Sequence, residues 1–362
     1  MPPFQCPRAG TTGVRRPTPD NLWRPFLKRI VLAAAAVFAL AATALYHGAP
    51  SLFKEPLLAL NRSLSGLEEK TAEAAMHQVH YLDSGATPGP PAQGAASARR
   101  VPVVLLHGIF AEKDHWVEFA RPLTATHRVI APDLPGFGES TRREDQAYDY
   151  AAHTERLRAL LDALGIEKAH LAGNSMGGTI AALFAAAHPG RVASVAFIGA
   201  PHGIRSPQPS AMDHLIDSGQ RPLVAHDAAA FDAMMALVFE KRPFLPHPIL
   251  HATQQDALRN AASNARLWDA QLKDRYLLQE KLATLGQHPT LVLWGENDRV
   301  FHPSGMRPLK AALPGAQVEA LPGMGHLPMM EAPRDTALRY AEFLRHLGAQ
   351  PTRSISMPEK SH

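Results

Sequence analysis

The sequence predicts an α/β protein with a mostly parallel sheet flanked by helices, a helical lid inserted between late strands, and an N-terminal apolar helix. Three observations lead to this prediction. From residue 76 onward, short apolar runs alternate with amphipathic stretches, as in a parallel sheet whose strands are joined by helices. Between about residues 205 and 286 the alternation stops and no strand pattern is present. Residues 30–46 are apolar without a charged residue.

The expected strands are short apolar runs that end at turn residues. The run "VPVVLLHG" at 101–108 is continuously apolar, which is typical of a strand buried on both faces. The leucines of the stretch 151–166 recur at helical spacing, and the pattern ends at Gly165. Strands are predicted at 77–83, 101–108, 127–136, 168–175, 192–201, 289–298 and 316–323, and helices at 151–166, 177–190 and 332–348.

The chain has 362 residues, of which 46% are hydrophobic, so it can bury one large core or two modest ones. The stretch 84–100 is rich in Gly, Pro, Ala and Ser and is expected to be a loop. The predicted organisation is a basic disordered leader at 1–29, a transmembrane anchor or signal segment at 30–50, a linker or helix at 51–75, a core at 76–204 and 287–348, a helical lid at 205–286, and a disordered tail at 349–362.

The net charge of +4 is concentrated at the N-terminus. The first 29 residues contain six basic residues and one acid, a net +5, which leaves −1 for the rest of the chain. A nucleic-acid-binding domain would carry its positive charge on the folded part, so nucleic acid is not expected as a partner. The single cysteine, Cys6, cannot form an intramolecular disulfide, and its Pro-rich surroundings do not suggest a catalytic thiol.

The apolar run at 30–46 is followed by uncharged residues up to Lys54, which is just long enough to span a bilayer. Two interpretations remain open. An uncleaved anchor is favoured, while a cleaved signal peptide would use the small residues Ala42–Ala44. Basic residues stay on the cytoplasmic side. The expected localisation is therefore the inner membrane with the domain on the periplasmic or exterior side, or, after cleavage, the periplasm or the medium.

The stretch "LAGNSMGG" at 171–178 places one serine between glycines, at the junction of an apolar strand and an alanine-rich helix. It fits the pattern G-x-S-x-G, in which Gly173 and Gly177 lack side chains so that strand and helix can approach each other around Ser175. The N-terminus of the following helix directs its N–H groups at the reaction centre. The pattern predicts that Ser175 is a nucleophile.

A serine nucleophile needs a base, and the base needs a carboxylate to orient it. In chain order the acid and then the base are expected after the serine. Asp298 follows a late strand in "LVLWGENDRV", and it is preferred to Glu296, which lies directly in the turn. His326 lies in the loop between the last strand and the closing helix. The predicted catalytic residues are Ser175, Asp298 and His326.

An oxyanion hole needs backbone donors that are in place before the reaction. One is expected from the N–H of Met176, the residue after the nucleophile. The second is expected from the N–H of Ile109, in the loop after the strand 101–108. His107 and Gly108 are expected to support the shape of this loop.

The motifs "HGIF", "DLPGFGES", "GNSMGG", "GENDRV" and "GHLPMMEAP" occur in the order found in α/β-hydrolases, and the resemblance covers about residues 76–348. The stretch "HGIFAEKDHW" resembles the HGFxxxKDxW stretch of bacterial lipases and esterases that are similar to monoacylglycerol lipases; that branch often carries an N-terminal apolar helix. The resemblance implies a carboxylic ester hydrolase that acts on acylglycerols or other acyl esters and uses no cofactor.

Two other functions stay open. "GNSMGG" also resembles the carbon–carbon hydrolases that cleave ring-opened aromatic products, and a non-catalytic ligand receptor on the same fold is an alternative of another class. The expected partners are a small-molecule ester or lipid and a membrane reached through the N-terminal helix. The sequence does not indicate the oligomeric state.

Residues outside the predicted catalytic set have other expected roles. Asp114 and Trp116 are expected to hold the oxyanion loop and not to touch substrate. In "HPILH", His247 and His251 could be a metal pair on a helix. However, Pro246 and Pro248 argue against a regular helix there and no third ligand is evident, so no metal is predicted. The Met and Phe side chains of the lid are expected to form its core more than an acyl groove. They are Met212, Phe231, Met234, Met235, Phe239 and Phe244.

Overall fold

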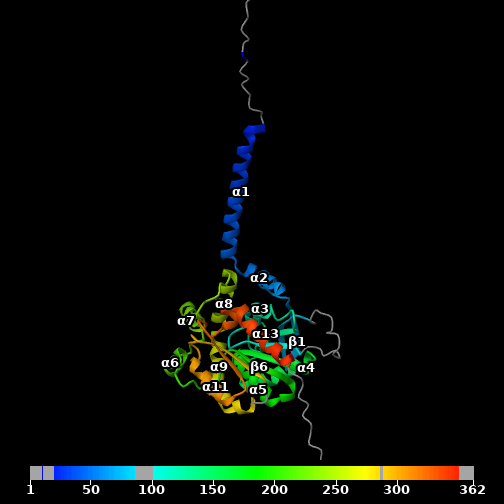
Figure 1. Cartoon of the computed structure of the whole chain (residues 1–362). Helices are drawn as coiled ribbons and strands as arrows, with labels where there is room; N and C mark the ends of the chain where they lie inside the picture. Colours follow the sequence, from blue (N-terminus) through cyan, green and yellow to red (C-terminus); the bar gives the residue numbers. More distant parts are fainter. Residues whose placement is uncertain (1–9, 11–19, 86–100, 286–287, 350–362) are drawn as a thin grey trace, which may run out of the picture.

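The computed structural model describes residues 10, 20–85, 101–285 and 288–349, and it contains a single eight-stranded sheet within those residues (Figure 1). The strand order is β1-β2-β4-β3-β5-β6-β7-β8; β1 and β2 are antiparallel to their neighbours and the remaining pairs are parallel. The strands are β1 (Glu68–Ala74), β2 (His77–Asp83), β3 (Val103–Leu106), β4 (Val129–Pro132), β5 (Ala169–Ser175), β6 (Val192–Pro201), β7 (Thr290–Gly295) and β8 (Gln317–Leu321). The predicted α/β class with its mostly parallel sheet is confirmed.

Helices cover both faces of the sheet. Alternate residues of a strand point to opposite faces, so a strand that is apolar throughout has side chains to bury on each face. Val104 and Leu106 belong to one hydrophobic cluster, together with side chains of α4 (Tyr150–Ala163), α5 (Met176–Ala187) and α11 (Met306–Ala312). Val103 and Leu105 belong to a second cluster, with α3 (Val117–Ala120), α12 (Pro328–Glu331) and α13 (Pro333–Ala349). The continuously apolar sequence of β3 is therefore explained by burial on both faces.

The lid is inserted between β6 and β7, and in its described part helices alternate with irregular segments and no strand is present. It consists of α6 (Ala211–Asp217), α7 (Ala228–Val238), α8 (His247–Arg259), α9 (Ala261–Leu272) and α10 (Leu277–Lys281). The α8 helix begins where no regular helix was expected, and that expectation was wrong. Its prolines lie in the first turn, where a proline needs no hydrogen-bonded N–H and is tolerated.

The N-terminal helix α1 (Asp20–Gly48) stands away from the domain, and a short turn joins it to α2 (Ser51–Leu64), which lies on the domain (Figure 1). The α1 helix begins at Asp20, within the stretch expected to be a disordered leader. The β1 strand lies at 68–74, where only a linker or helix was expected, so the sheet begins before residue 76. The rest of the expected leader, most of the 84–100 loop and nearly all of the expected tail lie outside the described residues.

Candidate active site

Ser175 lies at the junction of β5 and α5 with a backbone conformation that only a tight turn imposes. Its φ is 52° and its ψ is −118°. A Cβ on Gly173 would overlap the backbone of Gly177, and a Cβ on Gly177 would overlap the carbonyl oxygen of Leu106. The two glycines of the motif are therefore required by the close approach of helix and strand. A non-glycine residue with positive φ is strained, and such strain is concentrated at functional sites.

His326 and Asp298 come from two loops that follow neighbouring strands, β8 and β7. The ring Nδ1 of His326 lies 2.9 Å from Oδ2 of Asp298, and both side chains are buried. The other oxygen, Oδ1 of Asp298, accepts the backbone N–H groups of Val300 (2.8 Å) and Phe301 (2.9 Å). These bonds hold the carboxylate in one orientation, so that it can orient the imidazole. Glu296, the competing acid, is exposed.

The loop after β3 places Ile109 beside Ser175, and both residues line the same two cavities. His107 is fully buried and supports this loop at both ring nitrogens. Nδ1 donates to the carbonyl of Gly108 (2.7 Å), and Nε2 accepts the N–H of Leu134 (2.9 Å). Burial lowers the pKa of His107 to about 4, so the ring is neutral and can act as donor and acceptor at once. The supporting role of His107 stays a prediction.

Met176 is the first residue of α5, directly after Ser175. The first N–H groups of a helix have no partner within the helix, and the helix dipole is positive at this end. The N–H of Met176 is therefore available to an oxyanion at Ser175. Ile109 and Met176 remain the predicted donors.

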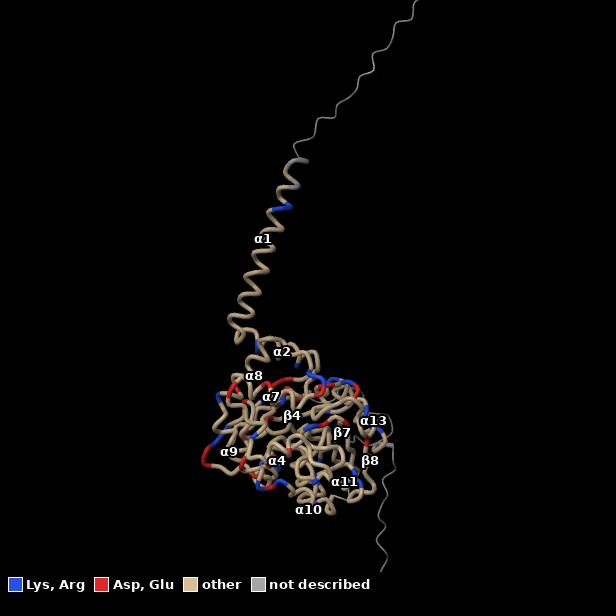
Figure 2. The backbone as a smooth tube through the Cα atoms, turned by 90° about the vertical axis from the view of Figure 1, so that its left-hand side faces the viewer, with Lys and Arg blue, Asp and Glu red and all other residues tan. Residues whose placement is uncertain are grey.

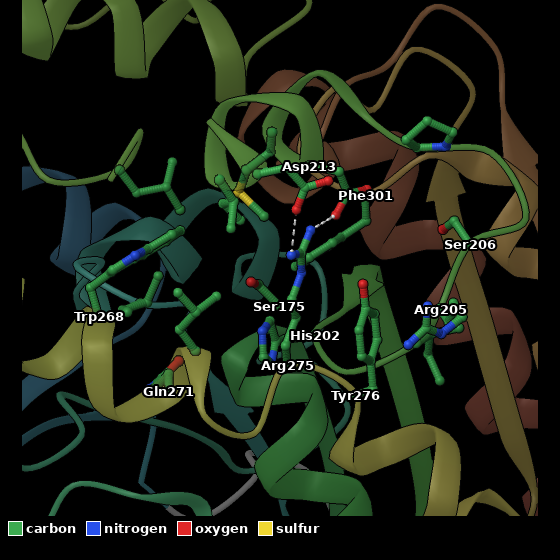
Figure 3. A pocket seen from close by; sticks show the side chains of 18 of the residues that line it. Ser175, His202, Arg205, Ser206, Asp213, Trp268, Gln271, Arg275, Tyr276 and Phe301 are labelled. Atoms are coloured by element: carbon green, nitrogen blue, oxygen red, sulfur yellow. Dashed lines mark hydrogen bonds and ion pairs between the residues drawn. The ribbon is translucent and has the colours of Figure 1, made fainter. Parts of the chain in front are cut away.

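Two cavities meet at Ser175. One, of about 340 Å³, also contains His326 and is lined mainly by apolar side chains of α2, α7 and α8. At its other wall, burial and the nearby Asp114 and Asp133 raise the pKa of Glu112 to about 7. The second cavity, of about 460 Å³, has more polar groups on its wall, including an Arg275–Asp213 ion pair of 2.6 Å (Figure 3). A substrate with two arms can thus be held on either side of the nucleophile.

The second cavity contains polar residues that the sequence analysis missed. His202 follows β6 and lines the cavity beside Ser175, and its Nδ1 lies 2.7 Å from the hydroxyl of Tyr150. Burial lowers the pKa of His202 to about 4. From the lid, Gln271 donates to the sulfur of Met176 (2.5 Å). The sequence signal for His202 is its position directly after β6, at the edge of the sheet where Ser175 lies, but His202 precedes Asp298 in the chain and so does not fit the order serine, acid, base.

The candidate metal ligands do not gather at the nucleophile. His247 and His251 lie on α8 with ring centroids 5.9 Å apart. Among the described residues, one group of three side chains could hold a metal, namely Glu69, His80 and Glu139. The ammonium of Lys113 already forms ion pairs with both carboxylates of that group, so a cation is in place there.

The two residues expected to hold the oxyanion loop lie near the end of the stretch that follows β3, within the short helix Lys113–Trp116. Trp116 is fully buried and packs edge-on against Phe119 at 5.2 Å between ring centroids. Asp114 forms a two-pronged ion pair with Arg62 of α2. Asp114 also lies on the wall of the smaller cavity.

Known proteins resemble this chain over most of its length. Lipase 1 of Psychrobacter immobilis is 30% identical, over 82% of this chain and 90% of its own. The monoacylglycerol lipase abhd6-A of Xenopus laevis is 30% identical, over 79% of this chain and 85% of its own. The crystal structure of a membrane phospholipase A, described as a bacterial virulence factor, aligns with a TM-score of 0.77 and 33% identity, covering 89% of this chain and 100% of that one.

The profile of the alpha/beta hydrolase fold family matches residues 101–333, which include the serine turn, the aspartate and the histidine described above. The sheet order, the inserted lid and the sequence relatives agree with this match. The chain belongs to the α/β-hydrolase fold family.

Proposed function

We propose that this protein is a serine hydrolase that cleaves carboxylic esters through an acyl-enzyme on Ser175. The single observation that carries the proposal is the joint position of a strained, buried serine and an Asp298-bound histidine on one cavity wall. The relatives named as lipases support the same reaction class, since they match most of this chain at about 30% identity.

In the proposed reaction, His326 takes the proton of Ser175 while the serine oxygen attacks the ester carbonyl. Asp298 stabilises the imidazolium that forms and keeps Nδ1 protonated. The N–H groups of Ile109 and Met176 receive the developing negative charge. The imidazolium then protonates the leaving alcohol, and water activated by the same histidine releases the acid.

A fluorophosphonate probe tests this assignment. We expect the probe to label the purified protein once, at Ser175, and to stop hydrolysis of p-nitrophenyl esters. The Ser175→Ala variant should remain folded and take no label. A folded wild-type protein that neither takes the label nor cleaves the esters would support the receptor alternative and reject the enzyme.

We further propose that the acyl chain occupies the smaller cavity and the alcohol the larger one. The smaller cavity is lined by aliphatic and Met side chains, among them Leu57, Met234 and Ile249. The larger one offers His202, Arg275 and other polar groups to an alcohol. Monoacylglycerols, or similar esters of a longer acid with a polar alcohol, fit this division, and the named function of one relative supports it.

Blocking each cavity separately tests the division. Ile249→Trp should reduce kcat/KM for p-nitrophenyl decanoate at least tenfold and leave the acetate ester unaffected. Ile216→Trp, in the larger cavity, should instead reduce turnover of monoacylglycerol relative to p-nitrophenyl esters. The reverse pattern would assign the acyl chain to the larger cavity.

The carbon–carbon hydrolase alternative is tested with a ring-cleavage dienoate in the same assays. Turnover of the dienoate without turnover of esters would replace the proposed reaction. The ester assignment is preferred because the relatives named as lipases match this chain over most of its length.

We propose that α1 anchors the protein in a membrane. Phe26–Gly48 is long and apolar enough to span one, with a mean hydropathy of 2.0, and none of it is buried by the protein. Lysine and arginine occur only at its start among the described residues of the helix (Figure 2). Exposed Leu52, Leu60 and Leu64 continue the apolar surface along α2.

By the distribution of basic residues, the catalytic domain would lie on the periplasmic or exterior side of an inner membrane. Carbonate washing and protease treatment of spheroplasts test this placement. Full-length protein that stays in washed membranes and is degraded from outside would support it. Shortened protein in the soluble periplasm would support a cleaved signal segment instead.

A further inference from the structure

The loop that carries Ile109, residues 107–116, is called here the oxyanion loop, and it is strained in its middle. Phe110 has a φ of 57°, which is unfavourable for a residue with a bulky side chain. The N–H of Ala111 returns to the carbonyl of Gly108 at 3.3 Å, a long bond for this turn. Such a conformation persists only where the surroundings hold it, so both ends of the loop need firm attachment.

The first end of the loop is held by His107, as described above. The second end is held by a buried cluster of charges. The backbone N–H of Lys113 donates to Oδ1 of Asp133 (2.6 Å), and its ammonium donates to Oδ2 of the same carboxylate (2.9 Å). Both side chains are fully buried. The ammonium also forms ion pairs with Glu139 and, at 3.3 Å, with Glu69.

The next residue, Asp114, is held from outside the core by α2. Arg62 donates through Nε to Oδ1 of Asp114 (2.7 Å) and through Nη2 to Oδ2 (2.6 Å), a two-pronged pair that fixes the carboxylate in direction as well as distance. The third nitrogen, Nη1, binds Glu69 at 2.5 Å. Arg62 is only 5% exposed, although it projects from a helix on the surface.

Glu69 therefore contacts both Arg62 and Lys113, and it joins α2, β1 and the oxyanion loop in one charge network. Within it two cations, Arg62 and Lys113, face four carboxylates, so the acidic groups outnumber the basic ones; the carboxylates are those of Glu69, Asp114, Asp133 and Glu139. Removing one member of a buried network leaves its partners unpaired and free to reorient. Loss of Arg62 would leave Asp114, five residues from Ile109, with only the longer ion pair to Lys113 at 3.9 Å and without either hydrogen bond from the guanidinium.

We propose that Arg62 is a positioning residue of the ester hydrolase, and that α2 is part of the catalytic apparatus and more than a connection to α1. Arg62 touches no substrate; it holds Asp114, and through the strained loop it sets the direction of the Ile109 N–H. The inference rests on the proposed function for the role of that N–H. The placement of the loop by α2 is a separate claim that can be measured without substrate.

The test compares Arg62→Ala with Arg121→Ala in the full-length protein. Arg121 is the matched control because it also fastens α2, through Ser65 (3.0 Å) and Asn61 (2.8 Å), but makes neither of these bonds with the oxyanion loop. On a short soluble ester, Arg62→Ala should lower kcat roughly tenfold, less than the loss of a whole oxyanion donor. KM should change little, and Arg62→Lys should recover part of kcat. Arg121→Ala should keep the wild-type kcat.

Hydrogen–deuterium exchange of the peptide 107–112 provides the readout that needs no activity. Exchange should rise in folded Arg62→Ala and stay at the wild-type level in Arg121→Ala. Equal effects of the two variants on kcat and exchange, or none from Arg62→Ala, would overturn the inference. If Arg62→Ala does not fold, the same comparison is made with Arg62→Lys, where unchanged exchange and kcat would count against it. A wild-type protein without esterase activity, but with the predicted exchange difference, would reject the proposed function and retain the positioning by α2.

Discussion

Asn174 donates its side-chain amide to the main-chain carbonyl of His326 (3.0 Å) and to the carbonyl of Ile198 (2.8 Å). Asn174, the residue before Ser175, thus holds the loop that carries His326. Gly199, with a φ of 83°, makes room for this contact, since a Cβ there would lie 2.5 Å from Nδ2 of Asn174 and 2.6 Å from the carbonyl of His326. The distance between Ser175 and the His326 loop therefore depends on the Asn174 side chain, which joins this loop to the end of β6.

Asn174→Ala should slow catalysis by removing both hydrogen bonds. We expect kcat on a short ester to fall about tenfold, because two buried carbonyls lose their donor and the His326 loop is released. The free energy of unfolding should fall by about 1–3 kcal/mol, as measured by urea titration. Unchanged kcat together with reduced stability would assign Asn174 a role in folding alone.

Asp298→Asn should leave the fold intact and nearly abolish catalysis. Its Oδ1 can still accept the N–H groups of Val300 and Phe301, but an NH₂ group would then face Nδ1 of His326. That group favours the tautomer with the proton on Nε2, which cannot accept the proton of Ser175. A loss of roughly 10³–10⁴ in kcat is expected. Stopped-flow assays with a p-nitrophenyl ester measure the loss of kcat, and a thermal melt checks that the variant is folded. Retention of more than a tenth of kcat would contradict the assigned role.

His153 should make the protein sensitive to acid. It is buried, and neither ring nitrogen has a hydrogen-bond partner among the described residues. Burial, with Arg156 nearby, lowers its pKa from 6.5 to about 3. Between these two values the unfolded chain binds a proton that the folded protein does not. Stability is therefore complete above pH 6.5 and is lost as the pH falls, by about 1.4 kcal/mol per pH unit for this group.

His153→Phe should reduce this acid sensitivity while it keeps the ring stacked on Phe137, now 6.0 Å away between centroids. We expect Tm of the variant to fall less than that of the wild type between pH 6.5 and pH 4. Other buried histidines, such as His107, leave some pH dependence in both proteins. Parallel Tm curves would show that His153 is charged or paired in the folded protein.

Gly177→Ala should prevent the protein from folding, because the added methyl would overlap the carbonyl oxygen of Leu106 and neither backbone can move away. Gly190 is the control. A Cβ there meets nothing within 4 Å, so Gly190→Ala should give soluble protein with wild-type Tm. A soluble and active Gly177→Ala variant would show that there is room for a methyl group between α5 and the carbonyl oxygen of Leu106.

The sequence predicted the parts of the fold that repeat a pattern. Runs such as 101–108 and 192–201 became β3 and β6 because burial on both faces demands continuous apolar residues. The β1 strand was missed since its sequence "EEKTAEA" is charged, as suits a mostly exposed edge strand. The expectation that "HPILH" at 247–251 forms no regular helix was wrong, because proline disfavours the interior of a helix but is tolerated in its first turn.

Local motifs also predicted Ser175 and the loops that carry Asp298 and His326, since each follows a strand at the same edge. Contacts between distant parts of the chain were beyond such reasoning. Arg62 and Asp114 are 52 positions apart, and no periodicity connects them. Gln271 reaches the second cavity only because the lid folds over the sheet. No local sequence pattern predicts contacts of this kind.

The meeting of two cavities at one serine has a consequence for the order of events in turnover. In the proposed division, the acyl group fills the smaller cavity, and the larger cavity is left for the departing alcohol and for the water that replaces it. An alcohol molecule that stays in the larger cavity occupies the position of this water. Its hydroxyl can then attack the acyl-enzyme and re-form an ester. Glycerol at high concentration should then draw the enzyme from hydrolysis toward the synthesis of new esters.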